Sequence, residues 1–107
     1  MTIDLSTDFG ASVAKRLRDE QVIWMTTTSR DQTPQPNPVW FLWTDNHQIM
    51  IFSEPGTAKV NNLARSPRVS LNFNSDSQGD HVAVITGTAA VDPNGYRDDE
   101  LRAYSTK

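Results

Sequence analysis

The residues best suited to chemistry lie where an apolar strand gives way to a helix. Ser53 ends a β-like run, and Thr57 and Lys59 follow a short Pro-Gly turn. Thr57 is placed to cap the helix, whose first turn offers N–H groups without acceptors and the positive end of the helix dipole. Two hydroxyls and an ammonium group around such a helix start favour an anion, for example a phosphate. A plain N-cap beside a solvent-exposed lysine is the alternative.

Polar and aromatic side chains earlier in the chain suit the recognition of a flat ring. Residues 40–43 are four large apolar residues in a row, and consecutive strand residues point to opposite sides of a sheet. Two should fill the core and two should cover the surface as a dimer face or ligand platform, unless the whole run packs in the core. Thr26 and Thr27, together with Gln35 and Asn37, can hydrogen-bond a ring edge, although threonines also simply favour strands.

No catalytic constellation of side chains stands out. The chain has no cysteine, its serines lie in no nucleophile-elbow pattern, and His47 and His81 have no obvious partners. The glycine patterns of Rossmann and P-loop nucleotide sites are missing, as is a His/Asp/Glu metal cluster. We therefore expect no catalytic residue and no metal site. Trp40 and Trp43 beside the phosphate seat suggest instead a phosphorylated aromatic cofactor.

The composition narrows the choice of partners. The 107 residues fit one domain, 1–107, and carry a net charge of −3 with no concentrated basic run, which argues against nucleic acid. No apolar run approaches the roughly 20 residues of a membrane span, and the N-terminus lacks signal-peptide features, so we expect a cytoplasmic protein. A hydrophobic content of 36% is low for a globular chain and favours pairing with a second copy.

Short strands and small helices must position these residues. Five strands are predicted, over residues 22–29, 39–44, 47–53, 68–74 and 81–92. The first three form a meander, and the alternate prolines of 34–38 place that segment on a sheet edge because each removes a donor. Gly87 suggests a bulge in the last strand. The pattern indicates a mainly β fold with small helices, a Greek-key or meander barrel.

Three helices flank the strands. Helices are predicted over 8–19, with Phe9, Val13 and Leu17 as the buried stripe, and over 58–65, with Val60, Leu63 and Ala64 as the inner face. A third, charged helix is expected from residue 93 onward, docked by Leu101 with help from Tyr96 and Tyr104.

Three segments of the chain resemble a known family. They read TTTSRDQTPQPNPVWF (26–41), IFSEPGTAKVNNLARSPRVSL (51–71) and VAVITGTAAV (82–91). Together they are similar to the pyridoxamine 5′-phosphate oxidase-like split β-barrels, and within them to the flavin/deazaflavin oxidoreductases, which bind FMN or a deazaflavin of the F-420 type. The likeness spans about residues 8–92, and the block T-x-K-x-x-N-L-x-x-x-P-R-V, residues 57–69, is fairly specific.

The resemblance implies a six-stranded Greek-key split barrel that works as a homodimer, with the cofactor in a groove between subunits. The cofactor would transfer hydride to or from a small organic substrate, while the protein positions it. Carried over by position, the cofactor-binding residues are Thr26, Thr27, Asn37, Pro38, Val39, Trp40, Ser53, Thr57 and Lys59. The last three would hold the phosphate, residues 37–40 would line the ring or ribityl chain, and the two threonines would lie nearby.

Two departures from the family pattern bear on these expectations. The family's last strand has no counterpart in the sequence, so we expect the protein to continue beyond Lys107. The basic phosphate clamp of true pyridoxamine 5′-phosphate oxidases is thin, which counts against pyridoxamine phosphate as the substrate.

Several functions remain open on the sequence. We expect an enzyme, a reductase that uses FMN or, slightly favoured by the resemblance, the deazaflavin, with Arg30, Arg65 and Arg68 near its longer anionic tail. A non-catalytic flavin carrier or sensor needs the same groove, and a pyridoxamine 5′-phosphate oxidase-type enzyme is a further alternative. A small barrel that binds oligonucleotides or oligosaccharides would leave the Thr57/Lys59 turn unexplained.

Overall fold

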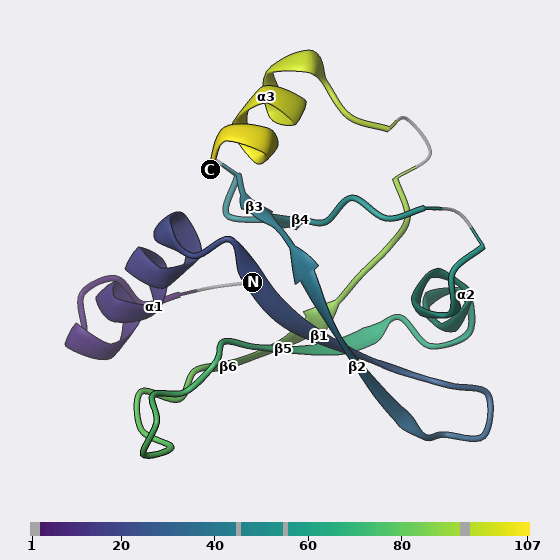
Figure 1. The fold of residues 1–107 in the computed structure, drawn as a ribbon, viewed down its shortest axis with the longest axis horizontal. Helices are drawn as coiled ribbons and strands as arrows, with labels where there is room; N and C mark the ends of the chain where they lie inside the picture. The colour runs from purple at the N-terminus through teal and green to yellow at the C-terminus, as the bar shows by residue number, and fades with distance from the viewer. Residues whose placement is uncertain (1–2, 45, 55, 93–94) are drawn as a thin grey trace.

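Antiparallel sheets and small helices make up the computed structural model, which describes residues 3–44, 46–54, 56–92 and 95–107 (Figure 1). In chain order the elements are α1 (Asp8–Asp19), β1 (Val22–Thr28), β2 (Pro34–Trp40), β3 (Leu42–Trp43), β4 (Ile49–Met50), α2 (Ala58–Arg65), β5 (Arg68–Asn72), β6 (Val84–Thr88) and α3 (Asp98–Thr106). The predicted fold class, mainly β with small helices, is confirmed. None of the described helices has the length and apolar character that a membrane crossing requires. The turn predicted at 45–46 and the helix start predicted at 93 fall partly outside the described residues.

The larger sheet has the strand order β2-β1-β5-β6, and every neighbouring pair is antiparallel. β1 and β2 form a hairpin whose register runs from Val22 opposite Trp40 to Thr28 opposite Pro34. The Pro-rich segment belongs to β2 and lies at the edge of this sheet, as predicted. Residues that face each other across such a pair share one face of the sheet, so the register fixes which side chains point inward.

The prolines give β2 an edge with acceptors but few donors. Pro34, Pro36 and Pro38 alternate with Gln35 and Asn37 along the strand. Because prolines have no N–H group, the residues between them must donate the ladder hydrogen bonds to β1. The backbone on the free side of this segment therefore presents carbonyl oxygens, which suits a ligand that donates hydrogen bonds and discourages the addition of another strand.

The hydrophobic core lies on the inner face of the larger sheet. Side chains of α1 pack on this face, and Trp43 of β3 and Ile49 of β4 are packed against the same cluster. The buried members of the cluster are Val13, Leu17, Ile23, Met25, Val39, Phe41, Leu71, Phe73 and Ala83. α1 and the small β3–β4 sheet thus form the second layer over the larger sheet.

α1 begins and ends where predicted, but its buried stripe is rotated. Val13 and Leu17 are buried as expected, whereas Phe9 is 66% exposed, so its predicted core position is wrong. Gly10 is buried instead, because the preceding chain passes so close that a Cβ at Gly10 would lie 1.8 Å from the carbonyl oxygen of Asp4. A contact between two backbones, rather than side-chain hydrophobicity, sets the rotation of the first turn.

The predicted second and third strands are interrupted or shortened. The run 39–44 breaks at Phe41, whose ring turns into the core and lies 6.0 Å from that of Phe73, so β2 ends at Trp40 and β3 is separate. β4 covers only Ile49–Met50 of the predicted 47–53. The antiparallel pairing of consecutive segments is as predicted, β1 with β2 and β3 with β4, but in the described part of the chain the two pairs belong to separate sheets, so the expected continuous three-stranded meander is wrong.

The last predicted strand is also shorter, and it is regular. β6 covers Val84–Thr88 rather than 81–92. Gly87 lies opposite Val69 in an unbroken register, so the expected bulge is wrong. With the break at Phe41, the described part of the chain holds six strands where the sequence predicted five.

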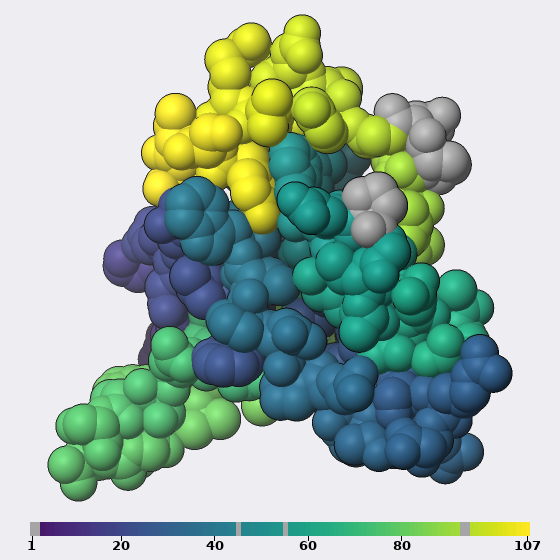
Figure 2. Space-filling model, turned by 45° about the vertical axis from the view of Figure 1, so that its right-hand side comes forward, coloured from purple at the N-terminus to yellow at the C-terminus, as the bar shows by residue number. Residues whose placement is uncertain are grey.

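Aromatic rings hold α3 in place. The ring of Phe52 stacks on Tyr104 with centroids 4.2 Å apart and on Tyr96 at 4.8 Å. The Tyr104 hydroxyl donates to the carbonyl oxygen of Trp40 at 2.5 Å. Tyr104 is buried as the docking prediction requires, whereas Leu101 is 37% exposed. In the space-filling view of Figure 2, α3 (yellow) lies directly against the teal chain around β4.

Lys107 makes a second contact between this end of the chain and the core. Its ammonium group donates to the carbonyl oxygens of Leu17 at 2.9 Å and Phe41 at 3.2 Å, and it lies 3.3 Å from the centre of the Phe41 ring. Burial lowers the pKa of Lys107 to about 8, although the nearby carboxylates of Asp19 and Glu20 act in the opposite direction. The charged amine is thus held in a site that partly disfavours its charge.

Replacing Lys107 by methionine should remove a pH-dependent contribution to stability. Between pH 8 and 10 the unfolded chain keeps a proton on Lys107 that the folded chain releases, so the free energy of unfolding should rise with pH. We compare the difference in melting temperature, wild type minus Lys107→Met, at two pH values. After allowance for solvent screening, this difference should increase by about 2–5 °C between pH 7 and pH 9.5. Thermal unfolding of both proteins at the two pH values measures this, and parallel pH profiles would contradict it.

Candidate functional site

The predicted phosphate seat is formed by the start of α2 and the loop before it. Thr57 takes the N-cap position with extended backbone (φ −71°, ψ 157°), and its carbonyl oxygen accepts the N–H of Asn61 at 3.0 Å. Its side chain makes no capping hydrogen bond; instead its hydroxyl oxygen lies 3.4 Å from that of Ser53. The two hydroxyls are therefore neighbours at the helix start, and the first-turn N–H groups have no side-chain cap from Thr57.

The charge at this helix start is positive. The first turn of α2 contains no acidic residue, and Lys59 lies there half-buried. Among the interactions of the described residues, no hydrogen bond or ion pair involves the Lys59 ammonium group. Unpaired N–H groups, two hydroxyls and an uncompensated ammonium group form a donor set that fits a phosphate monoester. Binding of a phosphate by these residues stays a prediction.

The remaining predicted residues lie on the β1–β2 hairpin and divide between its two faces. By register, Asn37 and Val39 share the inner face with Thr27, whereas Pro38 and Trp40 share the outer face with Thr26. Listed by exposure, Thr27 and Val39 are buried, Thr26 and Asn37 are intermediate, and Pro38 and Trp40 are exposed. One molecule can contact both sets only by passing the free edge of β2.

Two of these residues are limited in what they can offer. Val39 belongs to the hydrophobic core, so only its backbone is available to a ligand. The carbonyl oxygen of Trp40 already accepts the Tyr104 hydroxyl, which leaves its half-exposed indole as the contact surface.

A buried polar cluster that the sequence did not predict connects α2 to the hairpin. The side-chain amide of Asn62 donates to the Thr27 hydroxyl at 3.0 Å and to the Gln35 side-chain oxygen at 2.9 Å. Asn62 is 4% exposed, whereas Ala64, which was predicted to face inward, is exposed. The prediction used hydrophobicity alone and therefore chose Ala64 for the inner face. The sequence offered one other signal, which is that Asn62 lies three residues after Lys59 and so on the same side of the helix.

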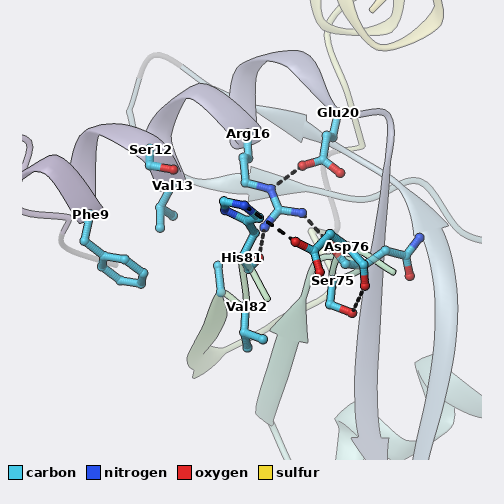
Figure 3. A pocket seen from close by; sticks show the side chains of 11 residues that line it. Phe9, Ser12, Val13, Arg16, Glu20, Ser75, Asp76, His81 and Val82 are labelled. Carbon is cyan, nitrogen blue, oxygen red and sulfur yellow. Dashed lines mark hydrogen bonds and ion pairs between the residues drawn. The ribbon is translucent and has the colours of Figure 1, made fainter. Parts of the chain in front are cut away.

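A groove lies elsewhere, between α1 and the loop joining β5 to β6 (Figure 3). It has a volume of 540 Å³ and is lined by Phe9, Ser12, Val13, Arg16, Glu20, Asn74, Ser75, Asp76, His81, Val82 and Ala83. None of the predicted cofactor residues contributes to it. No group of three His, Asp or Glu side chains placed to hold a metal ion occurs in the part of the chain that the structure describes.

Arg16 crosses this groove as a structural clamp. Its guanidinium group donates to Glu20 at 2.5 Å and to the carbonyl oxygens of His81 and Asn74 at 2.6 and 2.7 Å, and it lies 4.5 Å from the centre of the Phe73 ring. Figure 3 shows the guanidinium group between α1 and the loop. A cation with this many partners is poorly placed to receive an additional anion, so the groove does not compete with α2 as a phosphate seat.

Comparison with known proteins supports a family assignment and a fold. A family model described as pyridoxamine 5′-phosphate oxidase matches residues 9–107. A conserved hypothetical protein, Rv2991 from Mycobacterium tuberculosis, shares the fold with a TM-score of 0.68 at 19% identity, over 90% of this chain and 71% of that one. A further solved structure gives a TM-score of 0.72 at 16% identity, over 94% and 70% of the two chains. No curated protein is significantly similar in sequence.

Replacing Arg16 by methionine should destabilise the fold, because three hydrogen bonds and the ring contact are lost while the apolar stem remains. We expect a loss of roughly 2–3 kcal/mol in the free energy of unfolding, measured by chemical denaturation. Arg18→Met is the matched control, since Arg18 is exposed on the same helix and should cost no more than about 0.5 kcal/mol. Equal effects of the two substitutions would show that Arg16 is not a clamp.

Proposed function

The chain belongs to the pyridoxamine 5′-phosphate oxidase-like split-barrel family, and from this premise we propose that it is an oxidoreductase that uses bound FMN or an F-420-type deazaflavin. The family generally binds FMN or related flavins. The observation that carries the proposal is the start of α2, where the hydroxyls of Ser53 and Thr57 lie 3.4 Å apart and the first helical turn holds Lys59 and no acidic residue. Both cofactors carry a phosphate group that such a donor set would hold.

In this proposal the protein binds and orients, and its own side chains perform no chemistry. When bound, the flavin or deazaflavin ring supplies hydride transfer. Ser53, Thr57 and Lys59 hold the phosphate at α2. Asn37 and the acceptor-rich edge of β2 take the ring or ribityl portion, with Trp40 covering it from the outer face. Thr27 contributes through its hydrogen bond to α2, since its side chain is fully buried.

The deazaflavin remains slightly favoured on family resemblance, with FMN the close alternative. The deazaflavin tail is longer and anionic, so it needs cations beyond the phosphate seat. Arg65 donates to Asn62 at 2.8 Å and is therefore partly engaged. Arg68, exposed at the start of β5, and Arg30, exposed in the β1–β2 turn, are the other basic residues proposed for the tail.

We further propose that the protein works as a homodimer, with the cofactor in a groove between subunits. The outer face of the larger sheet carries Trp40 at 50% exposure, Val22 at 36% and Val84 at 59%. Exposed apolar side chains on one sheet face are typical of an interface, and a second copy would also complete a groove at the edge of β2. The proposed substrate is a small organic molecule.

Titration of the purified apo-protein with FMN and with the deazaflavin, followed by fluorescence, tests the cofactor assignment. Lys59→Ala should weaken binding of the preferred cofactor roughly 10- to 150-fold through loss of a charge-assisted hydrogen bond to the phosphate. Lys15→Ala is the control, because Lys15 is an exposed lysine of α1 that pairs with Asp19 and should leave the affinity unchanged.

Failure of the wild type to bind either cofactor as a dimer would contradict the oxidoreductase assignment. An unchanged affinity in Lys59→Ala would remove Lys59 from the site. Where binding occurs, turnover of the reduced bound cofactor with added organic acceptors separates an enzyme from a carrier or sensor, since both need the same binding groove.

A further inference from the structure

Asn62 is an unusual residue for a helix to bury. All eight residues of α2 are described, and Asn62 is the only one of them that is buried. The apolar residues beside it, Val60 and Leu63, are of intermediate exposure. α2 therefore meets the rest of the molecule through a small apolar contact with a polar side chain at its centre.

The Asn62 side chain is fully engaged in hydrogen bonds. Its amide nitrogen donates both protons, one to Thr27 at 3.0 Å and one to Gln35 at 2.9 Å, and its oxygen accepts from Arg65 at 2.8 Å. Thr27 lies on β1 and Gln35 lies opposite it on β2, so the two acceptors come from adjacent strands of one hairpin. A short side chain bound at both protons to two strands has very little freedom to move.

This arrangement fixes the orientation of α2. Apolar contacts depend on area and have little directional preference, whereas hydrogen bonds weaken steeply when their geometry is lost. A helix docked only by Val60 and Leu63 would be able to roll about its axis at small cost. The two hydrogen bonds from Asn62 remove that freedom because rolling would break both and leave the buried Thr27 hydroxyl without its donor.

The orientation of α2 determines where Lys59 lies. Residues three apart on a helix lie one above the other on the same side, so Lys59 sits one turn before Asn62. Side chains of a helix lean toward its N-terminus, which carries Lys59 toward the hydroxyls of Ser53 and Thr57. Holding Asn62 against the hairpin thus sets the position of the ammonium group relative to those hydroxyls and to the first-turn N–H groups.

We propose that Asn62 is a positioning residue for phosphate recognition: anchored to Thr27 and Gln35, it holds α2 at the rotation that places Lys59 and the helix N-terminus around one phosphate group. The inference rests on the proposed function, since it assigns the phosphate of the cofactor to this seat. Asn62 itself is buried against the hairpin and acts through the helix rather than by touching the phosphate.

The test compares the affinity for a phosphorylated cofactor with the affinity for the same molecule without its phosphate group. The pairs are FMN with riboflavin, and the deazaflavin with its phosphate-free core. In Asn62→Ala we expect the phosphorylated form to bind at least 10-fold more weakly, while affinity for the phosphate-free form changes less than 2-fold. Asn61→Ala is the matched control, because Asn61 is the exposed neighbour on the same helix and should change neither. In a protein that already carries Lys59→Ala, the Asn62→Ala substitution should weaken binding of the phosphorylated form by less than a further 2-fold. Both substitutions act on the same phosphate contact, so their effects should not add.

A second variant covers the case in which Asn62→Ala does not fold. Thr27→Val keeps the shape of the side chain and removes one acceptor of the Asn62 amide. It should therefore also weaken binding of the phosphorylated form relative to the phosphate-free form, by a smaller factor of about 3-fold. A direct contact of Thr27 with the ring would instead weaken both forms equally.

The outcomes separate this inference from the proposed function. A wild type that binds neither cofactor overturns the proposed function and this inference with it. A wild type that binds, together with an Asn62→Ala variant that loses both forms equally or neither, overturns the positioning role alone and leaves the cofactor assignment standing.

Discussion

The register between β1 and β2 is the constraint on which the rest of the structure depends. Seven residue pairs join the two strands, and a shift by one residue would move every inward side chain to the outer face. Ile23, Met25 and Val39 oppose such a shift because all three are buried on the inner face. The alternate prolines oppose it as well, since a slip would place residues without N–H groups where the ladder needs donors. Core packing and edge chemistry thus specify the same register.

That register also decides what a ligand can meet. It places Thr27 and Gln35 on the inner face, where they receive Asn62, and it leaves Trp40 on the outer face. The helix start and the hairpin are therefore joined through side chains from three elements rather than through one continuous cavity. The homodimer that we propose would place the second subunit at this strand edge.

Sequence patterns predicted the elements well where a local signal existed. α1 and α2 occupy the expected residues, and the edge position of the Pro-rich strand follows from missing donors. Sequence patterns were less reliable where a contact between residues far apart in the chain determines the local structure. Phe9 is exposed because the backbone at Asp4 packs on Gly10, and β2 ends where the Phe41 ring turns into the core. The hydroxyls of Ser53 and Thr57 are neighbours at the helix start whose first turn holds Lys59, and their binding of a phosphate stays a prediction. Asn62 was missed because its partners lie 35 and 27 residues away.

The acidic character of the chain is compatible with an anion site because the field at a site depends on the nearest charges. Three acidic residues, Asp98, Asp99 and Glu100, lie in the first turn of α3, and Glu20 in the groove beside α1 is paired with Arg16. Glu54 precedes α2 and is exposed in the loop. The first turn of α2 has no acidic residue. Solvent and salt screen exposed charges beyond about 8–10 Å, so a net charge of −3 weakens long-range attraction of a phosphorylated ligand but has little effect on a seat formed by close donors. Affinity at such a seat then depends on the relative positions of the donors. A buried asparagine that fixes these positions can therefore affect phosphate affinity without touching the phosphate.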